Sequence, residues 1–500
     1  MKRDFFAQYD LAAQSAQQRE MAVDYIVGKT HQPPPAWPAL ADVTDFAARL
    51  SLLAAATGTP QKDYARVGRR HAASGLLYWY TQGPFNDFLR RREEACGEGL
   101  SLLPTLPDLA IFPRGAWALQ FTFRLSQPYL SRDDTDFYIL DNPVKKEWVF
   151  KLPYVAPSQW KGALRAAMSR ELASDLVSDK VDEEVCMQRR LQLYRLFGNE
   201  KNCVADFLNC ARAQQRVGPR PDDESQREKW EKSFQKALAD IAKEFAQKLR
   251  DLGYRVGDVE GFQGRLHFYP TYFTQIGLEV LNPHPRATGA GQHPLYFECV
   301  PQGAEGMFTL LYVPFDRVGE GKHETRRQMT EDLAAVAKGV RAMMTLYGFG
   351  AKTSSGFGVA EKQVKKGALA VAMTDPRPIP AGKSESPTEN PLVQLEADMA
   401  DFVHRFQLSD FPRWTNAELK ASDWGRKRQS KYKRLRRRHP DWNESTRTWQ
   451  TASSVNEPLF AAPETPPQAL TTRDFDNFTS LVQQIRELAQ ATAKQPGGTQ

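Results

Sequence analysis

The sequence predicts an α+β fold, and three observations support this prediction. Residues 117–125 alternate between apolar and mostly polar or small side chains, which is the pattern of a half-buried strand. From about residue 158, leucine and methionine recur at every fourth position, the spacing of an amphipathic helix. Hydrophobic residues are 41% of the 500 residues and charged residues 25%, as in an ordinary globular protein. This composition excludes disorder along the whole chain.

The predicted elements divide the chain into four regions. Strong helix formers at helical spacing come before the first strand, and strand-like and helix-like segments then mix until a linker rich in proline and serine. In chain order, the regions are a helical N-terminal extension at 1–110, a mixed domain at 111–370 with a helical insertion at about 180–255, a linker at 371–392 and a basic C-terminal region at 393–500. An amphipathic helix is predicted near the end of the chain, over residues 475–493.

Charge and cysteine content narrow the class of protein. Lys and Arg number 67 against 60 Asp and Glu, and the net charge of +7 makes a polyanionic partner plausible. No window reaches about 18 uninterrupted apolar residues and no secretory signal is visible, so we expect a cytoplasmic protein without membrane association. The five cysteines are scattered without a CxxC pair, which favours reduced thiols. A zinc site of Cys186, Cys203 and Cys210 is the alternative.

A glycine-rich segment lies between a predicted helix and a predicted strand. Glycine lets the backbone approach a phosphate closely, and free N–H groups in such a loop can bind it. The predicted contacts are Gly348, Gly350, Lys352, Thr353, Ser354, Ser355, Gly356 and Gly358. A P-loop is excluded, because it needs glycine directly before its lysine and again five residues earlier, where this chain has Ala351 and Leu346. A glycine-rich turn without a ligand is the alternative.

Basic residues stand at the start of the helix near residue 158. Ser158 is a predicted N-cap, and Lys161 and Arg165 follow at four-residue spacing. The helix dipole favours acidic residues in a first turn, so cations there are locally unfavourable and indicate a site that meets an anion. The predicted contacts of this segment are Ser158, Lys161 and Arg165. Two exposed basic residues without a ligand are the alternative.

The densest positive charge lies in the C-terminal region. Residues 426–439 contain nine Lys or Arg and no acid, a density that suits phosphate contacts whose affinity falls steeply with salt. The predicted contacts of this run are Arg426, Lys427, Arg428, Lys431, Lys433 and Arg434. A solvated basic segment is the alternative.

The helix start and the glycine-rich segment together resemble the CRISPR-associated RAMP superfamily. Backbone subunits of type III effector complexes carry a Pro-Gly-Ser-Ser-Leu-Lys-Gly-x-x-Arg segment, which corresponds to residues 156–165. The glycine-rich loop of the superfamily corresponds to residues 348–358. Between them, residues 282–289 resemble a stretch that such subunits carry before a Phe-Glu strand, here Phe297 and Glu298.

This resemblance spans about residues 116–365 and implies a fold, a function and partners. The fold is a ferredoxin-like (RRM-like) RAMP domain with helical N-terminal, inserted and C-terminal additions. The function is CRISPR RNA binding in an antiviral type III-like effector ribonucleoprotein, with complementary target RNA and other effector subunits as partners. Two residues depart from the family pattern. Pro157 replaces a glycine, and Trp160 replaces an aliphatic residue. The indole of Trp160 either packs in the core or stacks on a base.

A catalytic residue is also implied by the resemblance. Type III backbone subunits often have an Asp-x-Pro-Val stretch shortly before the helix, and its aspartate cleaves target RNA with a divalent metal. The stretch here is residues 141–144, so Asp141 is the catalytic candidate for a metal-dependent endoribonuclease, with Mg²⁺ as the expected ion. A turn cap at Asp141 is the alternative. Rival carboxylates nearby are Asp133, Asp134 and Asp136.

Three other functions stay open. One is a structural RAMP subunit that binds CRISPR RNA without cutting. Another is a metal-free endoribonuclease that processes CRISPR repeat RNA through a histidine, for which His267, His284 and His293 lie in the RAMP-like region. The last is an RNA-binding protein outside CRISPR systems.

Overall fold

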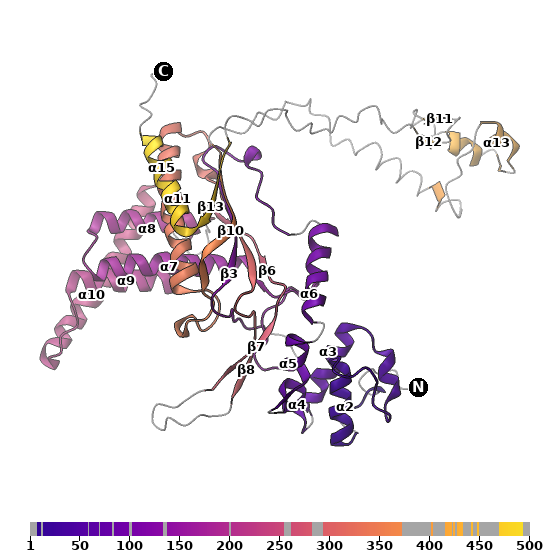
Figure 1. Cartoon of the computed structure of the whole chain (residues 1–500). Helices are drawn as coiled ribbons and strands as arrows, with labels where there is room; N and C mark the ends of the chain where they lie inside the picture. Colours follow the sequence, from indigo (N-terminus) through magenta and orange to yellow (C-terminus); the bar gives the residue numbers. More distant parts are fainter. Residues whose placement is uncertain are drawn as a thin grey trace. The chain divides into compact units, whose positions relative to one another are not determined.

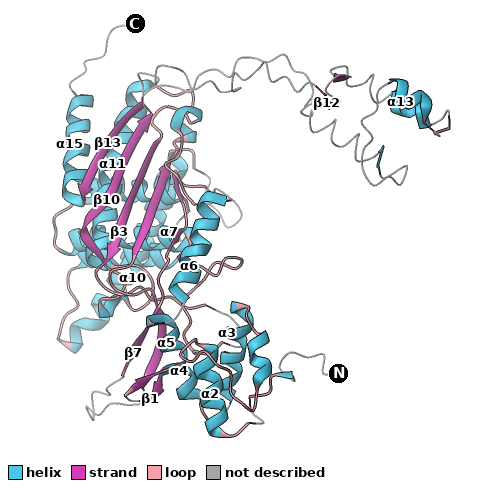
Figure 2. Ribbon diagram, turned by 45° about the vertical axis from the view of Figure 1, so that its right-hand side comes forward, coloured by secondary structure: helices cyan, strands magenta, loops and turns pink. Residues whose placement is uncertain are grey.

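A five-stranded antiparallel sheet forms the centre of the fold (Figures 1 and 2). Its strands are, in spatial order, β13 (Leu470–Asn477), β10 (Ala360–Ala372), β3 (Trp117–Leu125), β9 (Glu305–Tyr312) and β5 (Leu266–Phe268). Along the chain, helix α7 (Pro157–Val177) lies between β3 and β5, and α11 (Lys322–Ala342) lies between β9 and β10. The four sheet strands other than β13 follow one another with α7 and α11 in the order β-α-β-β-α-β, and their order in the sheet is fourth, first, third, second, the topology of ferredoxin-like domains. The predicted α+β fold is confirmed.

The chain divides into two units. The first unit consists of Met1–Pro376 together with Ala469–Gln500, and the second unit is Arg377–Gln468. The computed structural model describes residues 8–11, 14–58, 60–69, 71–82, 85–99, 103–133, 138–199, 202–254, 262–282, 294–372, 402–403, 416–422, 424–425, 428–433, 442–443, 448–449 and 470–493. Within these residues, no helix combines the length and the apolar character that a membrane span needs.

The main core lies between the sheet and the helices on one of its faces. Odd-numbered residues of β3 point into it, and the side chains of Trp117, Phe121 and Phe123 are fully buried. The predicted stripe on α7 faces the same core, because Leu164, Met168, Leu172 and Leu176 are all buried there. The opposite face of the sheet carries a smaller apolar cluster, which includes Ala118, Leu311 and Ala370 and is partly covered by the segment before β3.

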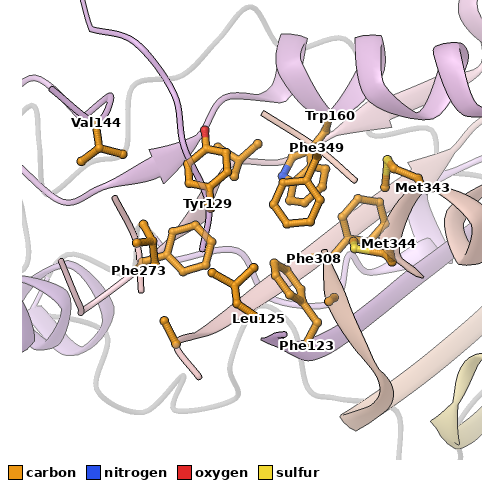
Figure 3. Close-up of a cluster of buried hydrophobic side chains, with 14 of the residues drawn as sticks. Phe123, Leu125, Tyr129, Val144, Trp160, Phe273, Phe308, Met343, Met344 and Phe349 are labelled. Atoms are coloured by element: carbon orange, nitrogen blue, oxygen red, sulfur yellow. The ribbon is translucent and has the colours of Figure 1, made fainter. Parts of the chain in front are cut away.

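Trp160 of α7 lies at the centre of the main core (Figure 3). Its ring centroid is 4.5 Å from that of Phe349 and 5.1 Å from that of Phe308 on β9. The indole Nε1 donates to Thr271 Oγ1 at 3.0 Å, so the one polar atom of the ring is satisfied. The structure therefore places this side chain in the core and not on a base-stacking surface.

The C-terminus returns to the sheet as a strand and a helix. Strand β13 pairs with β10, and the following helix α15 (Phe478–Ala493) packs against α11 (Figure 2). The predicted helix starts three residues too early, because the segment 470–477 is extended and the side chain of Asn477 caps the helix at Thr479 N and Ser480 N. This strand was missed because its alternating residues are mainly Thr, Arg and Asp, so no apolar period marks it.

Helices dominate the N-terminal region. Its elements are α2 (Ala16–Ile26), α3 (Phe46–Ala55), α4 (Lys62–Val67), β1 (Gly68–Arg69), β2 (Ala72–Ala73), α5 (Gly75–Thr81) and α6 (Phe85–Glu94). Aromatic rings join them, since Phe46 stacks on Phe88 with centroids 4.0 Å apart and lies 4.8 Å from Trp79. The buried side chains of this region therefore belong to the same apolar cluster as the main core.

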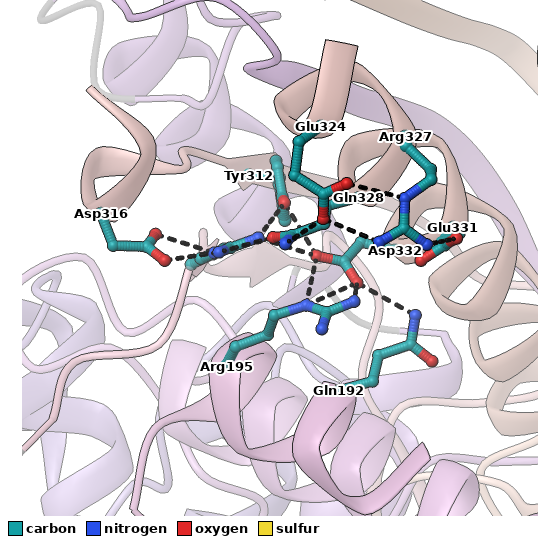
Figure 4. A network of polar contacts seen from close by, with 10 residues as sticks. Gln192, Arg195, Tyr312, Asp316, Glu324, Arg327, Gln328, Glu331 and Asp332 are labelled. Carbon is teal, nitrogen blue, oxygen red and sulfur yellow. Dashed lines mark hydrogen bonds and ion pairs between the residues drawn. The ribbon is translucent and has the colours of Figure 1, made fainter. Parts of the chain in front are cut away.

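The segment near residues 180–255 consists of α8 (Glu183–Phe197), α9 (Asn202–Val217) and α10 (Glu224–Asp251). A buried ion-pair network joins it to the domain (Figure 4). The fully buried carboxylate of Asp332 on α11 accepts hydrogen bonds from Arg195 Nη2 on α8 at 2.6 Å, from Tyr312 Oη at 2.8 Å and from Arg265 Nη1 at 3.2 Å. Burial, and then the charge of Asp332, raises the pKa of Tyr312 well above its usual value, so this hydroxyl remains a donor.

We predict that Trp160→Ala lowers the free energy of unfolding by about 3–5 kcal/mol, because it empties a fully buried ring site. Trp148→Ala is the matched control, since that indole is 81% exposed and its loss should change the free energy by less than about 0.5 kcal/mol. Denaturant unfolding of both variants measures the difference. Equal effects would contradict the assigned core position.

A second prediction concerns the buried network. Asp332→Ala leaves Arg195 and Arg265 without their shared partner in the interior, so we expect a loss of about 3–5 kcal/mol. Glu331→Ala removes the neighbouring acid, whose side chain is 47% exposed and pairs with Arg327, and should cost less than about 1 kcal/mol. Thermal unfolding of the two variants separates these values, and a Glu331 effect as large as that of Asp332 would refute the network.

Candidate nucleic-acid interface

The start of α7 presents polar and basic side chains at its exposed end. The helix begins at Pro157, and Ala156 occupies the N-cap position without a side-chain hydrogen bond. The predicted N-cap at Ser158 is therefore wrong, because proline prefers the first helical position and moves the N-cap two residues earlier, to Ala156. Ser158 is exposed, and Lys161 and Arg165 are partly exposed. No acidic residue lies in this first turn, so the positive end of the helix dipole and both cations act together.

The glycine-rich loop turns back sharply between α11 and β10. Gly350 has φ 95° and Gly358 has φ 68°, a region that other residues rarely adopt. A Cβ at Gly350 would lie 2.4 Å from the carbonyl oxygen of Leu130, and one at Gly358 would lie 1.9 Å from that of Phe349. These two glycines are thus required by close backbone packing within the protein.

Other residues of the loop are open to solvent. The segment Thr353–Ser355 forms a single 3-10 turn, in which Ser354 and Ser355 are exposed. Lys352 before it is exposed and has φ 56°, and its Nζ lies 5.2 Å from the ring centroid of Phe297. The loop therefore offers one cation and two hydroxyls to a ligand.

Aromatic contacts bring the helix start and the loop together. Phe349 of the loop packs on Trp160 of α7, and Tyr129 lies between the two segments (Figure 3). The Tyr129 ring centroid is 5.6 Å from that of Phe349, and its hydroxyl donates to Gln159 Oε1 at 2.9 Å. The two predicted RNA-contacting segments thus share one buried support.

The Asp141 loop is held by a buried carboxylate. Glu298 lies on β8 (Leu295–Cys299), which pairs with β7 (Gly277–Leu281), and its side chain is fully buried. It accepts from Val144 N at 2.9 Å and from Tyr138 Oη at 2.5 Å, and it forms an ion pair with Lys146. Tyr80 of α5 donates to the same carboxylate.

The hydroxyls around Glu298 remain protonated donors. Burial, followed by the charge of Glu298, raises the pKa values of Tyr80 and Tyr138 well above their usual range. This network was not predicted, although a glutamate inside the apolar strand 295–299 is the kind of signal that could have indicated it.

Asp141 itself points into solvent. Its side chain is 81% exposed, and Arg66 Nη2 lies 3.4 Å from its Oδ1. The next residue, Asn142, forms a parallel β-bridge with Phe297, over whose ring Lys352 lies. The Asp141 loop, the glycine-rich loop and the start of α7 are therefore joined through neighbouring contacts at one end of the domain. The proposed turn-cap role of Asp141 has no matching hydrogen bond within the described residues.

The carboxylate fits Mg²⁺ only as one ligand among several. Within the described ranges, no three His, Cys, Asp or Glu side chains gather to hold a metal ion. Mg²⁺ is commonly bound by one or two carboxylates together with waters and substrate phosphates, so a single aspartate is an adequate protein contribution. Of the rival carboxylates, Asp133 is described, and Asp134 and Asp136 lie outside the described residues.

The alternative zinc site receives no support from the described cysteines. Cys186 is buried and burial raises the pKa of its thiol, which disfavours the thiolate that binds metals. Cys210 is exposed, and the side chain of Cys203 lies outside the described set.

Histidine provides one described candidate for metal-free chemistry. His267 on β5 is partly buried, and burial followed by the charge of Lys161 lowers its pKa, so its imidazole is neutral near pH 7. His284 and His293 lie outside the described residues.

The basic run belongs to the second unit. That unit has the elements α13 (Asn416–Ala421), β11 (Trp442–Asn443) and β12 (Thr448–Trp449). Arg428 lies over the Trp424 ring, 4.1 Å from its centroid, and Lys433 is exposed. Lys431 is partly exposed, and Arg426, Lys427 and Arg434 lie outside the described residues. The contacts predicted for this run stay predictions.

Comparison with known proteins identifies the domain. Residues 136–361 match the model of the RAMP superfamily. No curated protein matches the chain. A search of solved structures finds a chain of the type III-B Cmr-beta complex bound to cognate target RNA (13% identity, 70% of this chain and 99% of that chain, TM-score 0.29) and Cmr6 from Pyrococcus furiosus (15%, 49% and 98%, 0.23).

A third similar chain comes from a CRISPR RNA-guided surveillance complex, with 13% identity, coverage of 59% of this chain and 85% of that chain, and a TM-score of 0.27. TM-scores this low do not establish a common fold, so the family model is the informative match. Residues 136–361 are therefore a RAMP superfamily domain within this chain.

Proposed function

We propose that this chain is a CRISPR RNA-binding subunit of a type III-like effector ribonucleoprotein. The observation that carries the proposal is the junction of three segments in a RAMP domain: the start of α7, the glycine-rich loop and the Asp141 loop. All three present polar or charged groups to solvent beside a rigid apolar support. Complementary target RNA and other effector subunits are the proposed partners.

The chemistry of these groups suits an RNA backbone. Lys161, Arg165 and Lys352 supply positive charge for phosphates, and Ser354 and Ser355 can donate to phosphate or ribose oxygens. Such contacts recognise the strand without reading its bases, so sequence choice would come from base pairing between CRISPR RNA and target. The basic run of the second unit would add further backbone contacts.

Cleavage of the paired target at Asp141 is the finer part of the proposal. The side chain is exposed enough to meet RNA, whereas its loop is held at Val144 and Asn142 by contacts with β8. Mg²⁺, when bound there with RNA phosphates, would supply stabilisation of the developing negative charge. The protein's own contribution would be to hold one carboxylate at a fixed place beside the backbone.

A structural RAMP subunit that does not cut is the second candidate. It is favoured by the ion pair between Asp141 and Arg66, because a paired carboxylate can also serve only to fix its loop. In that case, neighbouring subunits would perform the cleavage.

We predict that Lys352→Ala or Lys161→Ala weakens RNA binding and lowers the salt dependence, with the slope of log affinity against log salt falling by about 0.7 for each lost contact with a single strand. The control is Lys232→Ala, which removes the same charge from an exposed i, i+4 pair with Glu228 on α10. Filter binding of CRISPR RNA at several salt concentrations gives the slopes. Equal slopes for all variants would exclude these lysines as phosphate contacts.

Cleavage is tested in the purified native complex with its own RNA and a matching labelled target. If Asp141 is catalytic, Asp141→Ala should remove cuts that depend on Mg²⁺, with a rate loss of at least about 100-fold and unchanged target binding. Unchanged cutting in the variant would support the structural subunit. Cutting of precursor RNA in EDTA that is lost in His267→Ala would instead indicate the metal-free endoribonuclease.

A further inference from the structure

The N-terminal extension contributes a charged side chain to the Asp141 loop. Arg66 lies in the last turn of α4, far outside residues 136–361 that match the family model, and its side chain is only 14% exposed. Its Nε donates to the carbonyl oxygen of Ile139 at 2.8 Å, and its Nη2 lies 3.4 Å from Asp141 Oδ1. One guanidinium therefore contacts both the backbone before Asp141 and the carboxylate itself.

Further contacts fix the extension to the same part of the domain. Tyr80 of α5 donates to the buried Glu298, and Asn86 of α6 accepts from Ile276 N at 3.2 Å. Helix α4 packs against α5, so Arg66 projects from a supported element and not from an isolated loop. The position of its guanidinium is thus defined by packing as well as by its own hydrogen bonds.

We infer that Arg66 is a positioning residue for Asp141, supplied by a region outside the family domain; this inference rests on the proposed cleavage function. The loop is held after Asp141 by the β-bridge of Asn142 and by the bond from Val144 N to Glu298. Arg66 holds it before Asp141, at Ile139. With both sides held, the exposed carboxylate keeps a defined position toward RNA.

Arginine suits this role because of its shape. The planar guanidinium has five N–H donors in a fixed fork, so it can donate to a carbonyl and face a carboxylate at the same time. Lysine keeps the charge but has a single donor group on a flexible stem. Arg66→Lys should therefore restore only part of the function that Arg66→Ala removes.

The experiment measures single-turnover cleavage of target RNA by the full complex carrying its own RNA. At saturating target, Arg66→Ala should lower the rate at least about tenfold while target affinity stays unchanged, because a small misplacement of a reacting group costs rate and not binding. The cleavage rate of Arg66→Lys should fall between that of Arg66→Ala and that of the wild type. Added to Asp141→Ala, the Arg66→Ala change should have no further effect.

Arg69→Ala is the matched control. Arg69 lies three residues further along the same region, is 70% exposed and pairs with Glu20 instead of the Asp141 loop. Its replacement should leave the rate unchanged. A rate for Arg66→Ala equal to wild type, or equal losses for Arg66 and Arg69, would overturn the inference.

A second readout does not depend on cleavage. Amide hydrogen exchange at residues 139–142 should become faster in Arg66→Ala and stay unchanged in Arg69→Ala. If the wild-type complex does not cut, the proposed catalytic function fails, and exchange still decides whether Arg66 holds the loop. Unchanged exchange in Arg66→Ala would overturn the positioning role in either case.

Discussion

The buried contact between Trp160 and Phe349 is the interaction on which the arrangement of the candidate interface depends. It joins the first turns of α7 to the glycine-rich loop, and both rings also pack on the sheet through Phe123. Because these side chains have no exposed surface beyond 1%, the two segments can move apart only by opening the core. Lys161 and Lys352, which belong to different elements, are thereby kept at the same end of the domain.

Two buried carboxylates connect the added regions to this domain. Glu298 accepts a hydrogen bond from Tyr80 of the N-terminal extension, and Asp332 accepts one from Arg195 of the helical insertion. A charge without a partner is expensive inside a protein, so each carboxylate has several donors and the removal of one partner is strongly destabilising. The N-terminal extension, which lies outside the family match, and the helical insertion, which lies within it, are consequently packed as parts of the same folded unit.

Rigid support and exposed chemistry are separated in the candidate site. Gly350 and Gly358 pack closely against the backbone of Leu130 and Phe349. The hydroxyls of Ser354 and Ser355 and the side chain of Lys352 are exposed to solvent. In the Asp141 loop, Val144 N donates a hydrogen bond to the buried carboxylate of Glu298, whereas the side chain of Asp141 is 81% exposed. Such an arrangement lets the exposed groups keep their positions without being desolvated before a ligand binds.

Periodicity and short motifs were enough to predict the mixed fold, strand β3, the buried stripe of α7 and the two segments that carry the family resemblance, because these signals lie in neighbouring residues. Strand β13 depends on tertiary structure, because the segment has no apolar pattern and is held as a strand by its pairing with β10. Tertiary structure also decided that Trp160 is core, that Glu298 holds the Asp141 loop and that Arg66, 75 residues before Asp141, contacts it. Contacts between residues so distant along the chain depend on how separate elements pack, and no local pattern encodes them.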